Sequence, residues 1–80
     1  MKINILAFGI AKDIIKNRVV SIDVPEGADV GFLKNKLCED FPDFQKLKSL
    51  AIAVNEEYRT DEFNLNERDE VVIIPPVSGG

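Results

Sequence analysis

The sequence contains no histidine and only one cysteine among its 80 residues. Histidine is the usual base beside a serine or cysteine nucleophile and a frequent zinc ligand, so both kinds of site lack a principal component. One cysteine cannot form a disulfide within the chain. The carboxylate pairs Glu56-Glu57 and Asp69-Glu70 lie in predicted loops without the spacing of a calcium-binding loop. No glycine-rich loop opens a helix, so a nucleotide site is not expected either. From these absences together we expect neither a metal nor a nucleotide cofactor on this chain, and no catalytic activity of its own.

Long apolar runs and an excess of basic residues are also missing. The longest apolar run is LAIAV, residues 50–54, whereas crossing a bilayer takes about 20 residues. The start MKINILAF is typical of a strand rather than a signal peptide, so we expect a cytoplasmic protein. Fourteen acidic and ten basic residues give a net charge of −4. Nucleic acids and anionic membranes are bound mainly through Lys and Arg, so neither is an expected partner, and a basic protein surface suits this chain better.

What is present is the composition of one small folded domain, 45% apolar and 30% charged. Alternating or continuous apolar residues predict strands at 3–8, 20–24, 50–54 and 71–74. The first is apolar on both faces, which favours a central place in a sheet. The polar stretch 55–64 is expected to be a loop.

Two helices are predicted between these strands. A short one after Gly9 would place Ile10, Ile14 and Ile15 on its inner side. The main helix begins after Asp29, a suitable N-cap, and stops at Pro42. Its apolar stripe repeats at helical spacing and consists of Val30, Leu33, Leu37 and Phe41.

The order strand, strand, helix, strand, strand predicts an α+β fold, most often a β-grasp, with a mixed four- to five-stranded sheet and one main helix on one face. The first two strands would form an antiparallel pair. Residues 1–76 would make the domain and residues 77–80 an extended tail.

Few side chains offer chemistry of their own. Ser21, Ser49 and Ser78 have no evident activating partner. Cys38 lies at the edge of the main helix's apolar stripe and is interpreted as a packing residue.

The terminal stretch PPVSGG is the remaining candidate. A carboxylate is a poor electrophile until another enzyme activates it, for example as an acyl-adenylate. Gly79 and Gly80 have no Cβ and could enter a narrow channel with the carbonyl open to attack. Pro75 and Pro76 cannot continue the sheet and would hold the tail extended. The alternative is an ordinary frayed terminus.

The chain resembles the ubiquitin-like sulfur carriers and, within them, the small subunits of molybdopterin synthase. The resemblance covers nearly the whole chain. Its quoted stretches are FGIAKDI, PEGADVGFLKNKL, LAIAVNEEY and, most specific, DEVVIIPPVSGG. The thiamine-pathway carriers are similar but usually lack the double proline. Ile74 occupies a position that is often aromatic in relatives.

This resemblance implies a mechanism and partners. An activating enzyme would use ATP and Mg²⁺ to adenylate Gly80, and a sulfur donor would convert it to a thiocarboxylate. Gly79 would thread the channel of the large synthase subunit, in a heterotetramer, where sulfur passes to a pyranopterin precursor in molybdenum cofactor biosynthesis. Acidic residues of the stretch 56–70 would lie at the rim of the interface. The implied partner-binding residues are Phe8, Ile74, Pro75, Pro76, Val77 and Ser78.

Several alternatives remain open at this point. The same tail would serve a protein modifier that ends in an isopeptide bond, or a thiamine-type sulfur carrier. A β-grasp interaction module with an inert tail is a third possibility. Lys12 and Asp13 match a basic-acidic pair of the family, but an ordinary surface pair is an equal explanation.

Overall fold

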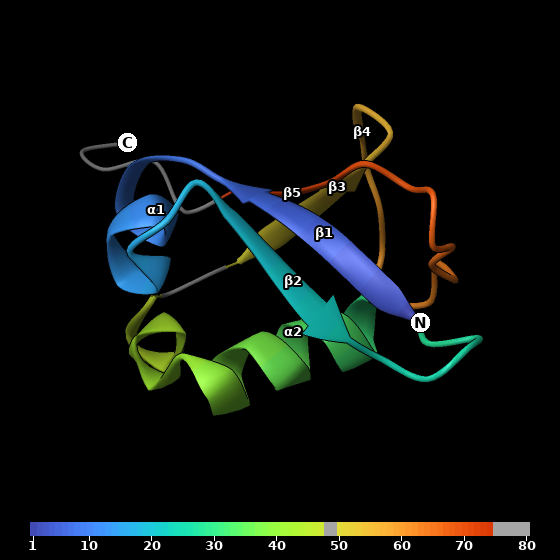
Figure 1. Cartoon of the computed structure of the whole chain (residues 1–80), viewed down its shortest axis with the longest axis horizontal. Helices are drawn as coiled ribbons and strands as arrows, with labels where there is room; N and C mark the ends of the chain where they lie inside the picture. The colour runs from blue at the N-terminus through green and yellow to red at the C-terminus, as the bar shows by residue number, and fades with distance from the viewer. Residues whose placement is uncertain (48–49, 75–80) are drawn as a thin grey trace.

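Five strands form one mixed sheet in the computed structural model, which describes residues 1–47 and 50–74 (Figure 1). Their order across the sheet is β2-β1-β5-β3-β4. The two central strands, β1 and β5, are parallel, and the other neighbours are antiparallel. The strands are β1 (Lys2–Ala7), β2 (Val19–Asp23), β3 (Ala51–Val54), β4 (Glu57–Tyr58) and β5 (Val71–Ile74).

The strand predictions are confirmed, with one addition. β1 has a neighbour on each side, and it forms an antiparallel pair with β2 as expected. The addition is β4, which lies inside the polar stretch 55–64 that was expected to be a loop. A two-residue strand is too short to show alternation, so no sequence pattern indicated it.

The main helix, α2 (Val30–Asp40), begins where its cap predicts. The Asp29 carboxylate accepts a hydrogen bond from the Phe32 backbone N–H at 2.8 Å, which satisfies one of the free donors of the first turn. The helix crosses one face of the sheet (Figure 1) and buries Val30, Leu33 and Leu37 there. A 3₁₀ helix, η1 (Pro42–Lys46), follows it and buries Phe44.

The inner face of the short helix α1 (Gly9–Ile15) differs in part from the one predicted. Ala11 and Ile15 are buried, whereas Ile10 is 47% exposed and Ile14 only half-buried. The prediction was therefore wrong for Ile10, whereas Ile14 packs against the core and Ile15 is buried in it. The helix starts directly at Gly9, whose φ of +56° turns the chain out of β1, and this turn sets the face that meets the sheet.

The core fills the space between the sheet and α2. Its members in the described ranges are all apolar. Alternate residues of β1 and β5 point inward, so the sheet has an inner face that is buried and an outer face that is not covered by α2. The largest fully buried side chains are Phe44, Ile3, Ile5, Leu33, Leu37, Ile52 and Ile73, with Val30, Val54 and Val71.

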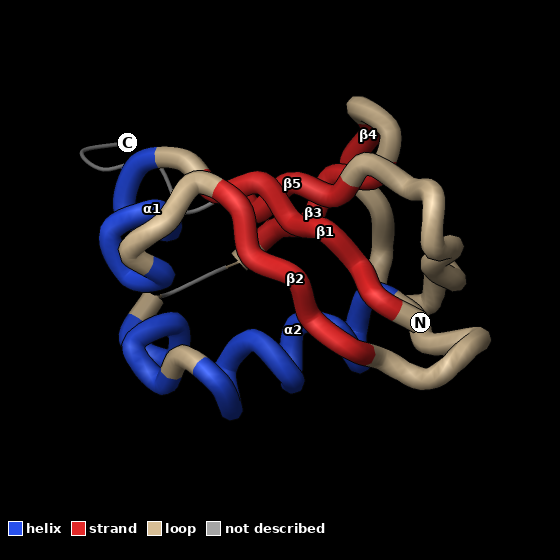
Figure 2. Tube along the Cα trace, viewed as in Figure 1, coloured by secondary structure: helices blue, strands red, loops and turns tan. Residues whose placement is uncertain are grey.

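The two ends of the sheet differ in what surrounds them. Figure 2 shows α1 at the end where β1 and β5 finish, with the N-terminus at the opposite end. None of the helices in the described ranges is long and apolar enough to span a membrane.

Candidate functional site

β1 and β5 bring two predicted site residues to the same end of the sheet. In this parallel pair Ile5 lies beside Val71 and Ala7 beside Ile73, so the two strands finish together. Phe8 directly follows β1, and Ile74 is the last residue of β5. The predicted residues Pro75, Pro76, Val77, Ser78, Gly79 and Gly80 lie outside the described residues, so the division of the chain at residue 76 stays a prediction.

A row of side chains crosses the outer face of the sheet. Residues directly paired between neighbouring strands share a face, and the registers can therefore be followed from one edge of the sheet to the other. Leu6 pairs with Val19 on one side and with Val72 on the other, Val72 pairs with Ala53, and Ala53 pairs with Tyr58. We call this set the outer row: Val19, Leu6, Val72, Ala53 and Tyr58.

The outer row and its neighbour Phe8 expose large apolar side chains. Tyr58 is 71% exposed, Phe8 56% and Val19 45%. Phe8 lies two residues beyond Leu6 and therefore on the same face, and Ile74 stands in the same relation to Val72. Aromatic side chains gathered on one exposed face are typical of a protein-binding surface.

The outer face becomes more polar away from this end. Nearer the start of β1, Asn4 pairs with Ser21, whose hydroxyl donates a hydrogen bond to the Asn4 side-chain oxygen at 2.6 Å. Lys2 pairs with Asp23 at the strand's beginning. The apolar half of the face is thus the half next to the end of β5, from which the predicted tail would leave.

Acidic residues border the outer row on the β4 side. The stretch 56–70, which contains β4, carries seven acidic and two basic residues, and so it accounts for the whole net negative charge of the chain. Glu56, Glu57 and Glu70 are exposed. An apolar centre with an acidic border is complementary to a surface with basic residues around an apolar patch. The interface itself stays a prediction.

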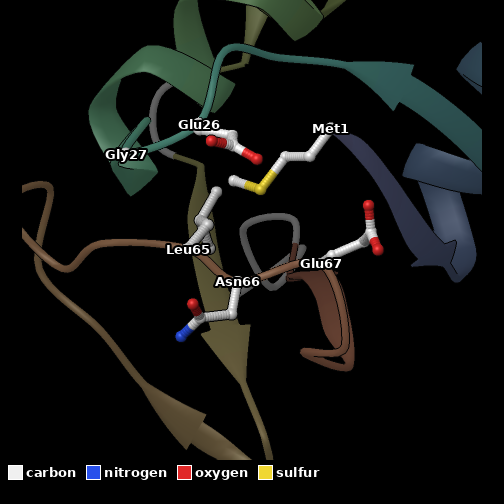
Figure 3. A pocket seen from close by; sticks show the side chains of 6 residues that line it. All are labelled: Met1, Glu26, Gly27, Leu65, Asn66 and Glu67. Carbon is white, nitrogen blue, oxygen red and sulfur yellow. The ribbon is translucent and has the colours of Figure 1, made fainter.

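A pocket of about 330 Å³ lies at the other end of the molecule (Figure 3). Met1 and Glu26 extend toward one another across it, and Leu65 lies on the same side as Asn66 and Glu67. It is near the start of β1, away from Phe8, so it does not belong to the apolar surface. Within residues 1–47 and 50–74 there is no group of three or more His, Cys, Asp or Glu side chains that could hold a metal ion.

The other candidate residues are separate from the outer row. Cys38 is half-buried and packs against the core, which confirms its interpretation as a packing residue. Lys12 and Asp13 are exposed on α1, and neither forms an ion pair with another described residue.

Sequence reasoning missed most of the outer row. Tyr58 was placed in a loop, and Val19 lay just before the predicted strand 20–24. Leu6 and Val72 were predicted as strand residues without a role in binding. The alternation of β1 does place Leu6 and Phe8 on one face, but it does not say which strands lie beside them.

Comparison with known proteins decides the family. The model of the ThiS family matches residues 5–80. The chain belongs to the ThiS family. Its resemblance to the ubiquitin-like sulfur carriers is thereby confirmed.

Two curated relatives are similar to this chain over nearly its whole length. The chain is 36% identical to the molybdopterin synthase sulfur carrier subunit of Caenorhabditis elegans, covering 100% of this chain and 99% of that protein. It is 39% identical to the subunit of the same name from Dictyostelium discoideum, covering 95% and 93%.

Solved structures confirm the β-grasp fold. A putative molybdopterin converting factor subunit 1 from Pyrococcus furiosus superposes with a TM-score of 0.87 at 24% identity, covering 96% of this chain and 99% of that one. Small archaeal modifier protein 1 of Haloferax volcanii gives 0.82 at 20% identity, covering 95% and 98%. A chain of the complex of subunits 1 and 2 of the molybdopterin-converting factor from Helicobacter pylori gives 0.67 at 27% identity over all of both chains.

Proposed function

We propose that this ThiS-family protein is the sulfur carrier subunit of a molybdopterin synthase, and that Gly80 carries the sulfur as a thiocarboxylate. The relatives of that name, at 36% and 39% identity over nearly their full length, support the assignment. The structural observation that carries it is that Phe8 and the outer row share one face of the sheet, with Phe8 at the end where β5 finishes. A surface there would seat the protein on a partner while the tail enters it.

The proposed chemistry takes place at the carboxylate of Gly80. An oxygen of this carboxylate attacks the α-phosphorus of ATP in the activating enzyme, which holds the Mg²⁺, and pyrophosphate leaves. Hydrosulfide released by the sulfur donor then attacks the acyl carbon, AMP leaves, and loss of the remaining S–H proton gives the thiocarboxylate. The chain binds no cofactor and supplies no catalytic side chain in this scheme, because the partners hold the acids and bases. We place these steps in the cytoplasm.

The proposed receiver of the sulfur is the large synthase subunit, which holds a pyranopterin precursor. The Helicobacter pylori neighbour, solved as a complex of subunits 1 and 2, supports a pairing of this kind. The outer row with Phe8 and Ile74 would make the apolar centre of that interface. The tail residues Pro75, Pro76, Val77 and Ser78 would lead Gly79 into the channel. Dimerisation of the large subunit would give a heterotetramer.

The modifier alternative has less support. Its likeness to the archaeal modifier rests on 20% identity, and at that level a similar structure speaks only for a shared fold. The Pyrococcus furiosus structure, named for molybdopterin conversion, has the same fold, so the fold does not separate the two functions. The sequence identities favour the carrier.

The decisive experiment is intact mass spectrometry after incubation with the activating enzyme, ATP and a sulfur donor. The carrier gains the mass difference between sulfur and oxygen, and a variant lacking Gly80 does not. Addition of one residue after Gly80 also abolishes the gain, because the terminal carboxyl then belongs to another residue and lies one residue further along the chain.

Each other outcome points to a defined alternative. Attachment of the chain to lysines of many proteins would identify a modifier. Sulfur delivered into thiazole synthesis rather than pyranopterin would identify a thiamine-type carrier. If the mass never changes and the extended chain behaves as the wild type, the protein is a binding module with an inert tail.

A further inference from the structure

The β3–β4 hairpin closes with a loop of two residues. Val54 pairs with Glu57, which leaves only Asn55 and Glu56 in the loop. Both have left-handed backbones, with φ of 53° and 70°. Two left-handed central residues define a type I′ turn, which fixes the register of a hairpin. This register is what sets Tyr58 opposite Ala53 on the outer row.

The Asn55 side chain ties this turn to the segment that leads into β5. Its Nδ2 donates a hydrogen bond to Asp69 Oδ1 at 3.0 Å, and its Oδ1 accepts one from the Glu70 backbone N–H at 3.0 Å. The Asn55 N–H donates to the Glu70 carbonyl at 2.8 Å. Asp69 is itself held, because its Oδ2 accepts from the Asn66 N–H at 2.8 Å. Both ends of the contact are thus fixed.

Tyr58 is otherwise held by the pairing of β4 with β3 and by its neighbour Arg59, whose N–H donates a hydrogen bond to the Ile52 carbonyl at 3.1 Å. β4 is two residues long, lies at the edge of the sheet and pairs only with β3. The Tyr58 side chain is 71% exposed, so burial does not fix it. Val72, which lies two strands from Tyr58 in the outer row with Ala53 between them, follows Glu70 by two residues. Asn55 therefore links the strand that carries Tyr58 to the strand that carries Val72.

We propose that Asn55 is a positioning residue for partner docking: it sets the place of Tyr58 relative to Val72 without contacting the partner's apolar patch itself. This inference rests on the proposed function, because the partner in question is the large synthase subunit. We call the two side-chain hydrogen bonds of Asn55, to Asp69 and to the Glu70 N–H, the clamp. A surface that is already in its binding arrangement loses less entropy on association. Loss of the clamp should therefore weaken binding.

Three variants test the clamp. Asn55→Asp replaces the Nδ2 donor with an oxygen facing Asp69. Asn55→Gly removes both side-chain hydrogen bonds and keeps the left-handed turn at no steric cost. The double variant Asn55→Asp with Asp69→Asn exchanges the amide and the carboxylate. In the exchanged pair the amide introduced at position 69 can donate to the carboxylate introduced at position 55, and its oxygen can still accept from the Asn66 N–H.

The measurement is the dissociation constant for the large synthase subunit by calorimetry, at a temperature where circular dichroism shows every variant folded. We expect Asn55→Asp and Asn55→Gly each to raise the dissociation constant by about tenfold. This is the change expected if binding is weakened by the net free energy of one or two hydrogen bonds. The double variant returns it to within about threefold of the wild type, since the exchanged hydrogen bonds are of the same kind.

Asp29→Ala is the matched control for stability. It removes a helix cap on the other side of the sheet and leaves the outer row untouched. An equal loss of affinity in Asp29→Ala, or unchanged affinity in both Asn55 variants, would overturn the inference while leaving the carrier function intact. If the wild-type chain does not bind the large subunit, the proposed function fails and this inference fails with it. Only a recovery of affinity in the double variant supports the clamp, because exchanging the amide and the carboxylate would not reverse a general loss of stability.

Discussion

Leu6 of β1 lies directly beside Val72 of β5, and both are half-buried on the outer face. The next pair along the strands, Ala7 and Ile73, is fully buried on the inner face. The same two strands therefore build the core on one side and an apolar surface on the other. They also finish together, so the surface stands where residues 75–80 begin.

Phe8 and Tyr58 should provide much of the binding energy for the large synthase subunit. Each is an aromatic residue that is more than half exposed on the outer face. Truncating such an anchor costs about 1.5–3 kcal/mol, so Phe8→Ala and Tyr58→Ala should each weaken binding by roughly tenfold to a hundredfold. Isothermal titration calorimetry with the purified large subunit measures the change.

Phe32 supplies the control for both variants. It is a 43% exposed aromatic residue, but it lies on α2, on the other side of the sheet. Phe32→Ala should leave the affinity unchanged within about twofold, as expected for a residue outside the interface. Loss of affinity in Phe32→Ala equal to that in Tyr58→Ala would place the interface elsewhere.

Glu56 carries a backbone strain that glycine would remove. Its φ of 70° is costly for a residue with a Cβ, and a glycine there gives the favoured Asn-Gly type I′ turn. Glu56→Gly should raise the free energy of unfolding by about 1 kcal/mol, or the melting temperature by roughly 4–8 °C. Thermal unfolding followed by circular dichroism measures this.

Glu56→Ala separates the backbone effect from the loss of charge. Alanine removes the carboxylate but keeps the Cβ, so its stability should stay within about 0.5 kcal/mol of the wild type. If Glu56→Ala stabilises the protein as much as Glu56→Gly, the gain comes from the charge and the strain argument is wrong.

Sequence patterns predicted the parts of the fold that depend on residues close together in the chain. Asp29 and the spacing of Val30, Leu33 and Leu37 define α2 because a cap and a helical period act within one segment. The inner face of α1 was not predictable in this way. Its seven residues contain apolar side chains on two sides, and the turn at Gly9 decides which side meets β1.

Only some residues of the candidate site could be predicted from the sequence: those at the ends of β1 and β5, but not those on the neighbouring strands. Phe8 and Ile74 follow from the resemblance and from their place at strand ends. Tyr58 does not, because it joins the outer row only through pairings between strands distant in the sequence. Register between such strands is a tertiary property, set by the shared core and by the turn at Asn55.

The Asp29 cap should contribute measurably to stability. Its carboxylate accepts the Phe32 N–H at 2.8 Å, and loss of such a cap costs about 1 kcal/mol. Asp29→Ala should lower the free energy of unfolding by this amount in urea denaturation, with an unchanged slope. Asp29→Ser keeps an acceptor at the cap and should retain most of the stability, whereas equal losses in both variants would point to a role other than capping.

The acidic border of the outer row should accelerate association with the large subunit. Opposite charges around an interface raise the association rate more than they slow dissociation, and salt screens them. The rate measured by stopped flow should therefore fall as salt rises. Removing two exposed charges next to the row, with Glu56→Gln and Glu70→Gln together, should lower the rate several-fold at low salt and leave dissociation nearly unchanged. Glu26→Gln with Glu39→Gln makes the same change in net charge away from the row, so an equal fall in that variant would show that only the total charge matters.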